Sequence, residues 1–190
     1  MFPITPDFYP ATPDIIAIVI EYSNANNINP ALVLGLIEQE SNFDLNAERY
    51  ESKVSGTGKP DYSSGLMQIL TSTARGMGFK STGDLEQDKE LLKDPRTNIY
   101  YGIKYLKTRL LKYKNLPLID AVRTYNSGSP LTPASSWYES NQQYGENVIT
   151  NMTKWDVRLA LGTKSNLTEN IVFAGLLGGL CIYLDKKLLG

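Results

Sequence analysis

The chain has 190 residues, none of them histidine, and its only cysteine is Cys181. Without histidine, a Ser-His-Asp triad, a Cys-His pair and an HExxH zinc site are excluded. A single cysteine cannot form an internal disulfide framework or a thiolate zinc cluster. If the chain is an enzyme, carboxylates, lysine, tyrosine or a bound cofactor must move its protons, so carboxylates are the first catalytic candidates.

A strong net charge is also missing, because 19 basic residues face 20 acidic ones. We therefore expect no nucleic-acid partner. The charge is uneven, with eight acids and three bases in residues 1–60 but seven acids and ten bases in residues 61–120. The basic stretch could hold an anionic polymer, but a solvated helix face is the favoured interpretation.

The two ends of the sequence differ in character. The first 14 residues contain four prolines and no lysine or arginine, which does not fit a secretory signal peptide. Residues 171–184 carry no charge and, extended to 167–189, approach the length of a membrane helix. Gly175 and Gly179 form a GxxxG pair, as found where membrane helices meet. We expect a membrane contact through residues 171–189; a buried terminal helix is the alternative.

Helical patterns dominate residues 14–155. Asn29-Pro30 and Asp94-Pro95 each combine a capping residue with proline at the first helical position. A last amphipathic helix is expected over residues 137–155, and a loop or small β-hairpin at residues 50–70, where Gly, Ser and Pro are frequent. The predicted fold is mainly α, organised as a catalytic domain (1–158), a linker (159–170) and an apolar tail (171–190).

Two glutamates, Glu38 and Glu40, end the apolar helix that begins at Pro30. A carboxyl group in apolar surroundings keeps its proton to higher pH, as a general acid near neutrality requires. Helical spacing places each glutamate over apolar neighbours, and either one could instead reach solvent at the helix end. Spacing alone does not choose between them.

Five segments in one order resemble the soluble lytic transglycosylase domain of the lysozyme superfamily, over about residues 8–155. They are Pro30–Val33 with Glu40–Phe43 and Asn46-Ala47, Gly65–Ile69 with Thr73-Ala74, Asp94–Leu106, Ala121 with Tyr125–Gly128, and Tyr144 with Val148. The resemblance implies a lysozyme-like helical fold of the goose-type and lytic transglycosylase kind. It also implies cleavage of the β-1,4 bond between N-acetylmuramic acid and N-acetylglucosamine in peptidoglycan, with formation of a 1,6-anhydro ring.

The resemblance also implies roles for single residues, with neither metal nor cofactor. Glu40 would act first as acid and then as base. The remaining residues would bind substrate or orient the glutamate, namely Ser41, Met67, Gln68, Tyr125, Asn126 and Tyr144. Structural roles stay open for three of them: a helix-end hydroxyl for Ser41, core packing for Met67 and a helix cap for Asn126.

A long insertion between Ala47 and Gly65 departs from the family pattern and supplies Asp61. Goose-type lysozymes carry aspartates near this segment and use water, so Asp61 could position a water and make the enzyme a hydrolase. The favoured alternative is a turn residue after Pro60.

Two further expectations concern the setting of the enzyme. It would act on the bacterial wall from a phage virion or a secretion apparatus, with partner proteins there. The alternative from another functional class is a membrane-seated structural component whose lysozyme-like domain only binds glycan.

Overall fold

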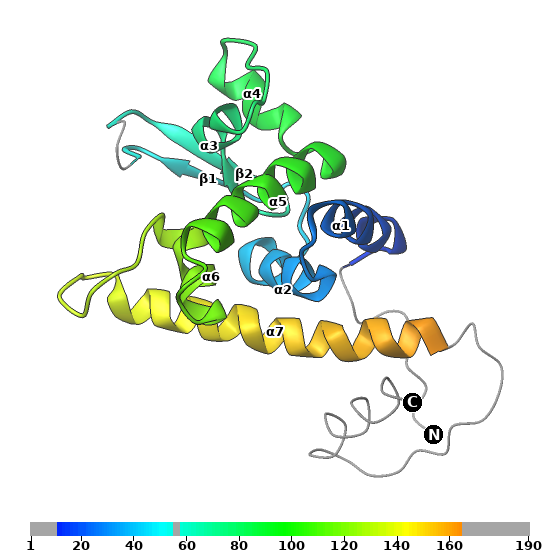
Figure 1. Ribbon diagram of the computed structural model, residues 1–190. Helices are drawn as coiled ribbons and strands as arrows, with labels where there is room; N and C mark the ends of the chain where they lie inside the picture. The colour runs from blue at the N-terminus through cyan, green and yellow to red at the C-terminus, as the bar shows by residue number, and fades with distance from the viewer. Residues whose placement is uncertain (1–10, 55–57, 165–190) are drawn as a thin grey trace. The chain divides into compact units, whose positions relative to one another are not determined.

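The structure is a computed structural model that describes residues 11–54 and 58–164 (Figure 1). The chain divides into two compact units, Met1–Leu159 and Ala160–Gly190, and only the end of one helix is described in the second. The described elements are α1 (Pro13–Asn26), α2 (Pro30–Ser41), β1 (Glu48–Glu51), β2 (Asp61–Ser64), β3 (Ile69–Leu70), α3 (Thr71–Gly76), α4 (Leu85–Leu91), α5 (Pro95–Lys112), α6 (Leu118–Ser127) and α7 (Tyr138–Lys164). This confirms the predicted mainly helical class with a small β element.

Local sequence signals place the starts of the two helices that matter most for the site. The Asn29 side chain accepts a hydrogen bond from the Ala31 backbone N–H at 2.8 Å, and Pro30 opens α2. Asp94 caps α5 in the same way through the Thr97 N–H, again at 2.8 Å. Both predicted Asx-Pro helix starts are therefore confirmed.

The hairpin strands β1 and β2 pair antiparallel, with Glu48 opposite Ser64 and Glu51 opposite Asp61. Strand β3 adds to β2 on the other side, so the sheet order is β1-β2-β3. Residues 65–68 connect β2 to β3 by a tight turn in which Gly65 and Gln68 have positive φ. The turn brings this segment back towards the helices.

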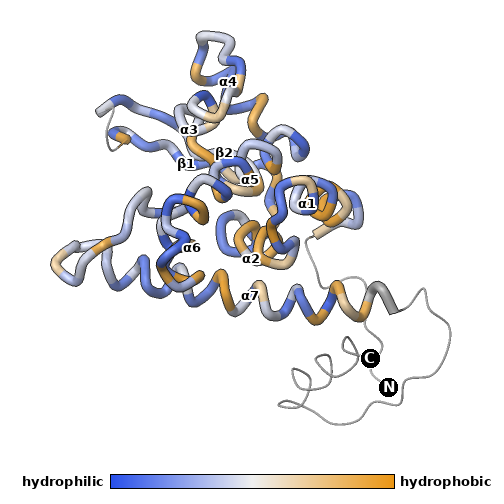
Figure 2. The backbone as a smooth tube through the Cα atoms, in the orientation of Figure 1, coloured by the Kyte–Doolittle hydropathy of each residue, from blue (hydrophilic) through white to orange (hydrophobic). Residues whose placement is uncertain are grey.

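Helix α2 lies at the centre of the core, because its residues 31–37 are all buried. Figure 2 shows hydrophobic residues gathered on α1 and α2. Gly35 permits a close approach of α7: a Cβ at this position would lie 2.5 Å from the Met152 nitrogen and 2.9 Å from the Val148 oxygen. The backbones of α2 and α7 thus meet directly, one turn before Glu40.

Two elements differ from the expectations. Helix α7 continues to Lys164, so the first part of the predicted linker 159–170 is helical. Residues 158–161 are good helix formers, and Leu159 packs against the core. Helix α4 was not predicted, because its seven residues, about two turns, have little apolar periodicity.

No helix in residues 11–54 and 58–164 has the length and apolarity to cross a membrane. The predicted apolar tail 171–190 lies outside the described residues.

Candidate active site

Glu40 stands at the end of α2 and receives a hydrogen bond from α7. The Tyr144 hydroxyl donates to Glu40 Oε1 at 2.7 Å. Burial raises the pKa of the Glu40 carboxyl from 4.5 to about 7, while the Tyr144 hydrogen bond and the positive charge of Arg49 act in the opposite direction. The residue as a whole is partly exposed, although its carboxyl is desolvated. It therefore has the acidity of a general acid that works near neutral pH.

Three tyrosines surround this carboxyl. Burial, and then the nearby Glu40 charge, raise the pKa of Tyr125 and Tyr144 well above the usual value, so both stay protonated. The rings of Tyr105 and Tyr125 pack with centroids 5.0 Å apart. The aromatic setting explains why Glu40 is desolvated although it ends a helix.

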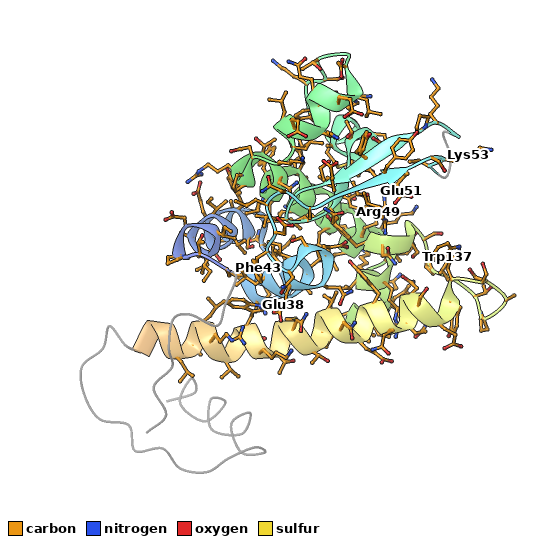
Figure 3. All side chains as sticks on the ribbon, turned by 180° about the vertical axis from the view of Figure 1, so that it is seen from behind. Glu38, Phe43, Arg49, Glu51, Lys53 and Trp137 are labelled. Carbon is orange, nitrogen blue, oxygen red and sulfur yellow. The ribbon has the colours of Figure 1, made fainter. Side chains whose placement is uncertain are left out.

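Glu38 is placed differently. Its Oε2 accepts a hydrogen bond from Trp155 Nε1 at 2.8 Å, and the Trp155 ring packs edge-on against Phe43. Figure 3 shows Glu38 beside Phe43 and away from Arg49. Geometry thus separates the two glutamates that spacing could not: Glu40 joins the tyrosines, and Glu38 ties α2 to α7.

The turn 65–68 is held against three helices through its backbone. Met67 N–H donates to Asn98 Oδ1 at 2.8 Å, and the Tyr125 hydroxyl donates to the Met67 carbonyl at 2.9 Å. The Ser41 hydroxyl donates to the Leu66 carbonyl at 2.8 Å. Ser41 therefore fixes this turn beside Glu40, and its hydroxyl also bonds the Ile37 carbonyl at 3.3 Å, as a helix-end hydroxyl does.

Two of the predicted substrate-binding side chains face the protein. Met67 is fully buried and packs against Gly102, where a Cβ would collide with the Met67 side chain. Gln68 Nε2 donates to the carbonyls of Ala47 at 2.9 Å and Gly65 at 3.0 Å. The core role left open for Met67 is the one that this structure has.

Asn126 is exposed next to the buried Tyr125. Its amide donates to Asn141 Oδ1 at 3.2 Å, and Asn141 in turn donates to Ser127 Oγ at 3.4 Å. These bonds join the end of α6 to the start of α7. Asn126 thus lies at the edge of the tyrosine-lined site, between the two helices that supply Tyr125 and Tyr144.

Asp61 is buried, and both carboxylate oxygens accept backbone hydrogen bonds. Oδ1 accepts from the Tyr62 N–H at 2.8 Å and Oδ2 from the Ser72 N–H at 2.9 Å. The carboxylate therefore links β2 to the first turn of α3. Asp61 is thus the first residue of β2 and not the turn residue expected after Pro60; its use in positioning a water stays a prediction.

Sequence reasoning missed two residues of this region. Asn98 is fully buried, and besides Met67 it bonds the carbonyls of Ser64 at 2.7 Å and Leu92 at 2.6 Å. The signal available in the sequence was the amide side chain of Asn98 on an otherwise apolar helix face. Arg49 projects from β1 near Glu40 and pairs with Glu51 at 2.5 Å; an isolated arginine in a hairpin offers no sequence signal.

Across the described ranges, no three or more acidic or cysteine side chains are grouped so as to hold a metal ion. The chemistry available from the side chains brought together here is proton transfer by one tuned carboxyl, supported by tyrosine hydroxyls.

Comparison with known proteins gives three findings. The family described as "Transglycosylase SLT domain" matches residues 17–149. A membrane-bound lytic murein transglycosylase C from Mannheimia succiniciproducens is 30% identical over 157 residues, which cover 78% of this chain and 40% of that protein. A solved structure of an inactive mutant of the lytic transglycosylase Slt from Pseudomonas aeruginosa superposes with a TM-score of 0.56 at 21% identity, over 76% of this chain and 24% of that one. The chain thus spans less than half the length of either protein, and the structural likeness shows a shared fold.

Proposed function

The chain belongs to the transglycosylase SLT domain family, and from this premise we propose that it is a peptidoglycan lytic transglycosylase. It cleaves the β-1,4 bond between N-acetylmuramic acid and N-acetylglucosamine and closes a 1,6-anhydro ring on the muramic acid. The observation that carries this proposal is the desolvated Glu40 carboxyl, with a pKa of about 7 and a hydrogen bond from Tyr144.

Glu40 acts first as the acid. Because Tyr144 donates to Oε1, the acidic proton resides on Oε2 and passes from there to the glycosidic oxygen. The bond from the anomeric carbon to this oxygen then breaks, and the N-acetylglucosamine side leaves as an alcohol. Positive charge develops at the anomeric carbon, next to the newly formed Glu40 carboxylate, which stabilises it.

Glu40 then acts as the base. Its carboxylate takes the proton of the muramic C6 hydroxyl as that oxygen bonds to the anomeric carbon. The carboxyl group is thereby restored, and no water is consumed. The high pKa of Glu40 suits both steps, because the group gains and loses a proton at similar cost near pH 7.

Other residues support this carboxyl. Tyr144 holds Glu40 in position, while Tyr125 and Ser41 fix the turn 65–68 beside it. Asn126, exposed at the edge of the site, and the partly exposed Gln68 would contact substrate, while Met67 would support the turn from the core. Residues 171–189 would hold the enzyme at a membrane. Carriage of the enzyme by a virion or a secretion apparatus is a separate prediction.

The test compares two matched variants on purified cell walls. Glu40→Gln should abolish release of soluble fragments, whereas Glu38→Gln should retain it, because a glutamine can still accept the Trp155 hydrogen bond. Mass spectrometry should find anhydro-muramic ends. Reducing ends would indicate hydrolysis, and wall binding without cleavage by the unaltered chain would indicate a glycan-binding module.

A further inference from the structure

The inward face of α7 forms a continuous stripe that ends at an exposed tryptophan. Asn141, Tyr144, Val148 and Trp155 recur at helical spacing, and each is at most 7% exposed. The same spacing, traced back, leads to Trp137, whose side chain is 72% exposed. Trp137 is therefore the most exposed large hydrophobic residue in the described part of the chain, at the end of a stripe that is otherwise buried.

Hydrogen bonds hold the backbone of Trp137 in place. Its carbonyl accepts from the Asn141 N–H at 3.0 Å and from Ser140 Oγ at 3.1 Å. Its own N–H donates to Ser135 Oγ at 3.3 Å. Asn141 also bonds Ser127 and Asn126, so the base of this tryptophan is tied to the edge of the active site. The ring is thus presented to solvent from a backbone that is already ordered, so binding a ligand need not order the backbone.

Trp137 directly precedes α7, and this position relates it to the Glu40 carboxyl. Tyr144, which contacts Glu40, follows Trp137 by seven residues, or about 10 Å of helix rise. Figure 3 shows Trp137 on the same side of the domain as Arg49, Glu51 and Lys53 of the hairpin. A linear polymer that passes Glu40 in this direction reaches the tryptophan a short distance from the cleaved bond.

We propose that Trp137 binds a sugar ring of the glycan strand at an outer position of the site, away from the cleaved bond. The indole presents a negative π face, which attracts the C–H groups on the apolar face of a pyranose ring. Ser135 and Ser140, which bond the Trp137 backbone, and Asn126, which is linked to it through Asn141, supply polar groups for the hydroxyl and acetamido substituents. The residue thus favours long strands over short fragments, and this inference rests on the proposed function.

The first experiment uses tryptophan fluorescence in the Glu40→Gln background, with purified glycan strands as the probe. The chain has two tryptophans, and Trp155 is buried, so a response to ligand reports on Trp137. We expect a saturable quench or blue shift. The further substitution Trp137→Phe should abolish this signal, and Trp137→Ala should weaken binding to sedimented cell walls about tenfold.

The second experiment measures kinetics in the active enzyme. Trp137→Ala should raise KM on long strands about tenfold and leave kcat unchanged, while Trp137→Tyr should restore most of the affinity. Leu111→Ala is the matched control, because Leu111 is also an exposed apolar side chain, at 62%, and lies outside the site. Its KM should equal that of the unaltered chain.

Two different failures are distinguishable. If walls bind Trp137→Ala as tightly as the unaltered chain, or if kcat falls while KM is unchanged, the tryptophan is not a sugar-binding residue and the proposed function stands. If the Glu40→Gln protein binds no glycan and the unaltered chain releases no fragments, the proposed function itself fails, and the inference with it.

Discussion

Replacing Glu40, the proposed catalytic acid, should stabilise the protein by an amount that depends on pH. Glu40→Gln keeps the shape and the acceptor oxygen for Tyr144 but removes the ionisation. Because burial raises the pKa of Glu40 from 4.5 to about 7, the folded chain holds this proton more tightly than the unfolded chain between those values. The free energy of unfolding of the unaltered protein therefore falls as the pH rises through this interval, whereas Glu40→Gln escapes this loss.

The size of the effect follows from linkage. Each pH unit in the interval costs about 1.4 kcal/mol, so the full interval from pH 4.5 to about 7 would cost roughly 3.4 kcal/mol. Glu40 is partly exposed, and solvent screening reduces this figure to about 2 kcal/mol. For a domain of this size, that corresponds to a Tm about 6 °C higher for Glu40→Gln than for the unaltered protein at pH values above 8. Below pH 4.5, this group should cause no difference in Tm.

Thermal unfolding of both proteins, followed by circular dichroism between pH 4 and pH 9, measures this difference. Glu38→Gln controls for the loss of a carboxylate at the same helix end. If the curves of Tm against pH are parallel for Glu40→Gln and the unaltered chain, the reasoning is refuted. A lower Tm of Glu40→Gln at pH 8 would show that the ionised carboxylate stabilises the fold, for example through Arg49.

Three further predictions concern groups around the same carboxyl. Tyr144→Phe removes a hydrogen bond that lowers the Glu40 pKa, so the alkaline limit of wall cleavage should move to higher pH in a pH–rate profile, with kcat about tenfold lower because Glu40 is less well positioned. Arg49→Gln should also move this limit upward, and 1 M salt should produce part of the same shift in the unaltered enzyme, since salt screens the exposed arginine. Asn98→Ala removes buried hydrogen bonds to the Met67 N–H and to the Ser64 and Leu92 carbonyls, so it should lower the free energy of unfolding by about 3 kcal/mol in urea titrations and reduce activity with it.

Much of the fold was predictable because its signals are local. The Asn29-Pro30 and Asp94-Pro95 starts need only adjacent residues, and the glycine- and serine-rich stretch after Ala47 indicated the hairpin. Helix α4 was not predicted, although Asp84 caps it by accepting a hydrogen bond from the Gln87 N–H at 3.0 Å, because the helix has little apolar periodicity. The last turns of α7 were also not predicted.

The site was predictable to the level of motifs but not of contacts. Family resemblance pointed to Glu40 and Tyr144, which the fold brings within 2.7 Å from positions 104 residues apart. It also pointed to Met67, whose side chain lies in the core while its backbone groups join α5 to α6. A motif does not state which atoms of a residue are used, and only tertiary packing decides this.

The origin of Tyr144 in the last described helix has a consequence for the order in which the enzyme becomes active. During synthesis, Glu40 leaves the ribosome long before α7 does, and a water-exposed carboxyl has ordinary acidity. It becomes a proton donor for neutral pH only when α7 docks across Gly35 and encloses it. If the proposed function is right, completion of the fold acts as a delay, because an unfinished chain lacks the acid that cleavage near neutral pH requires.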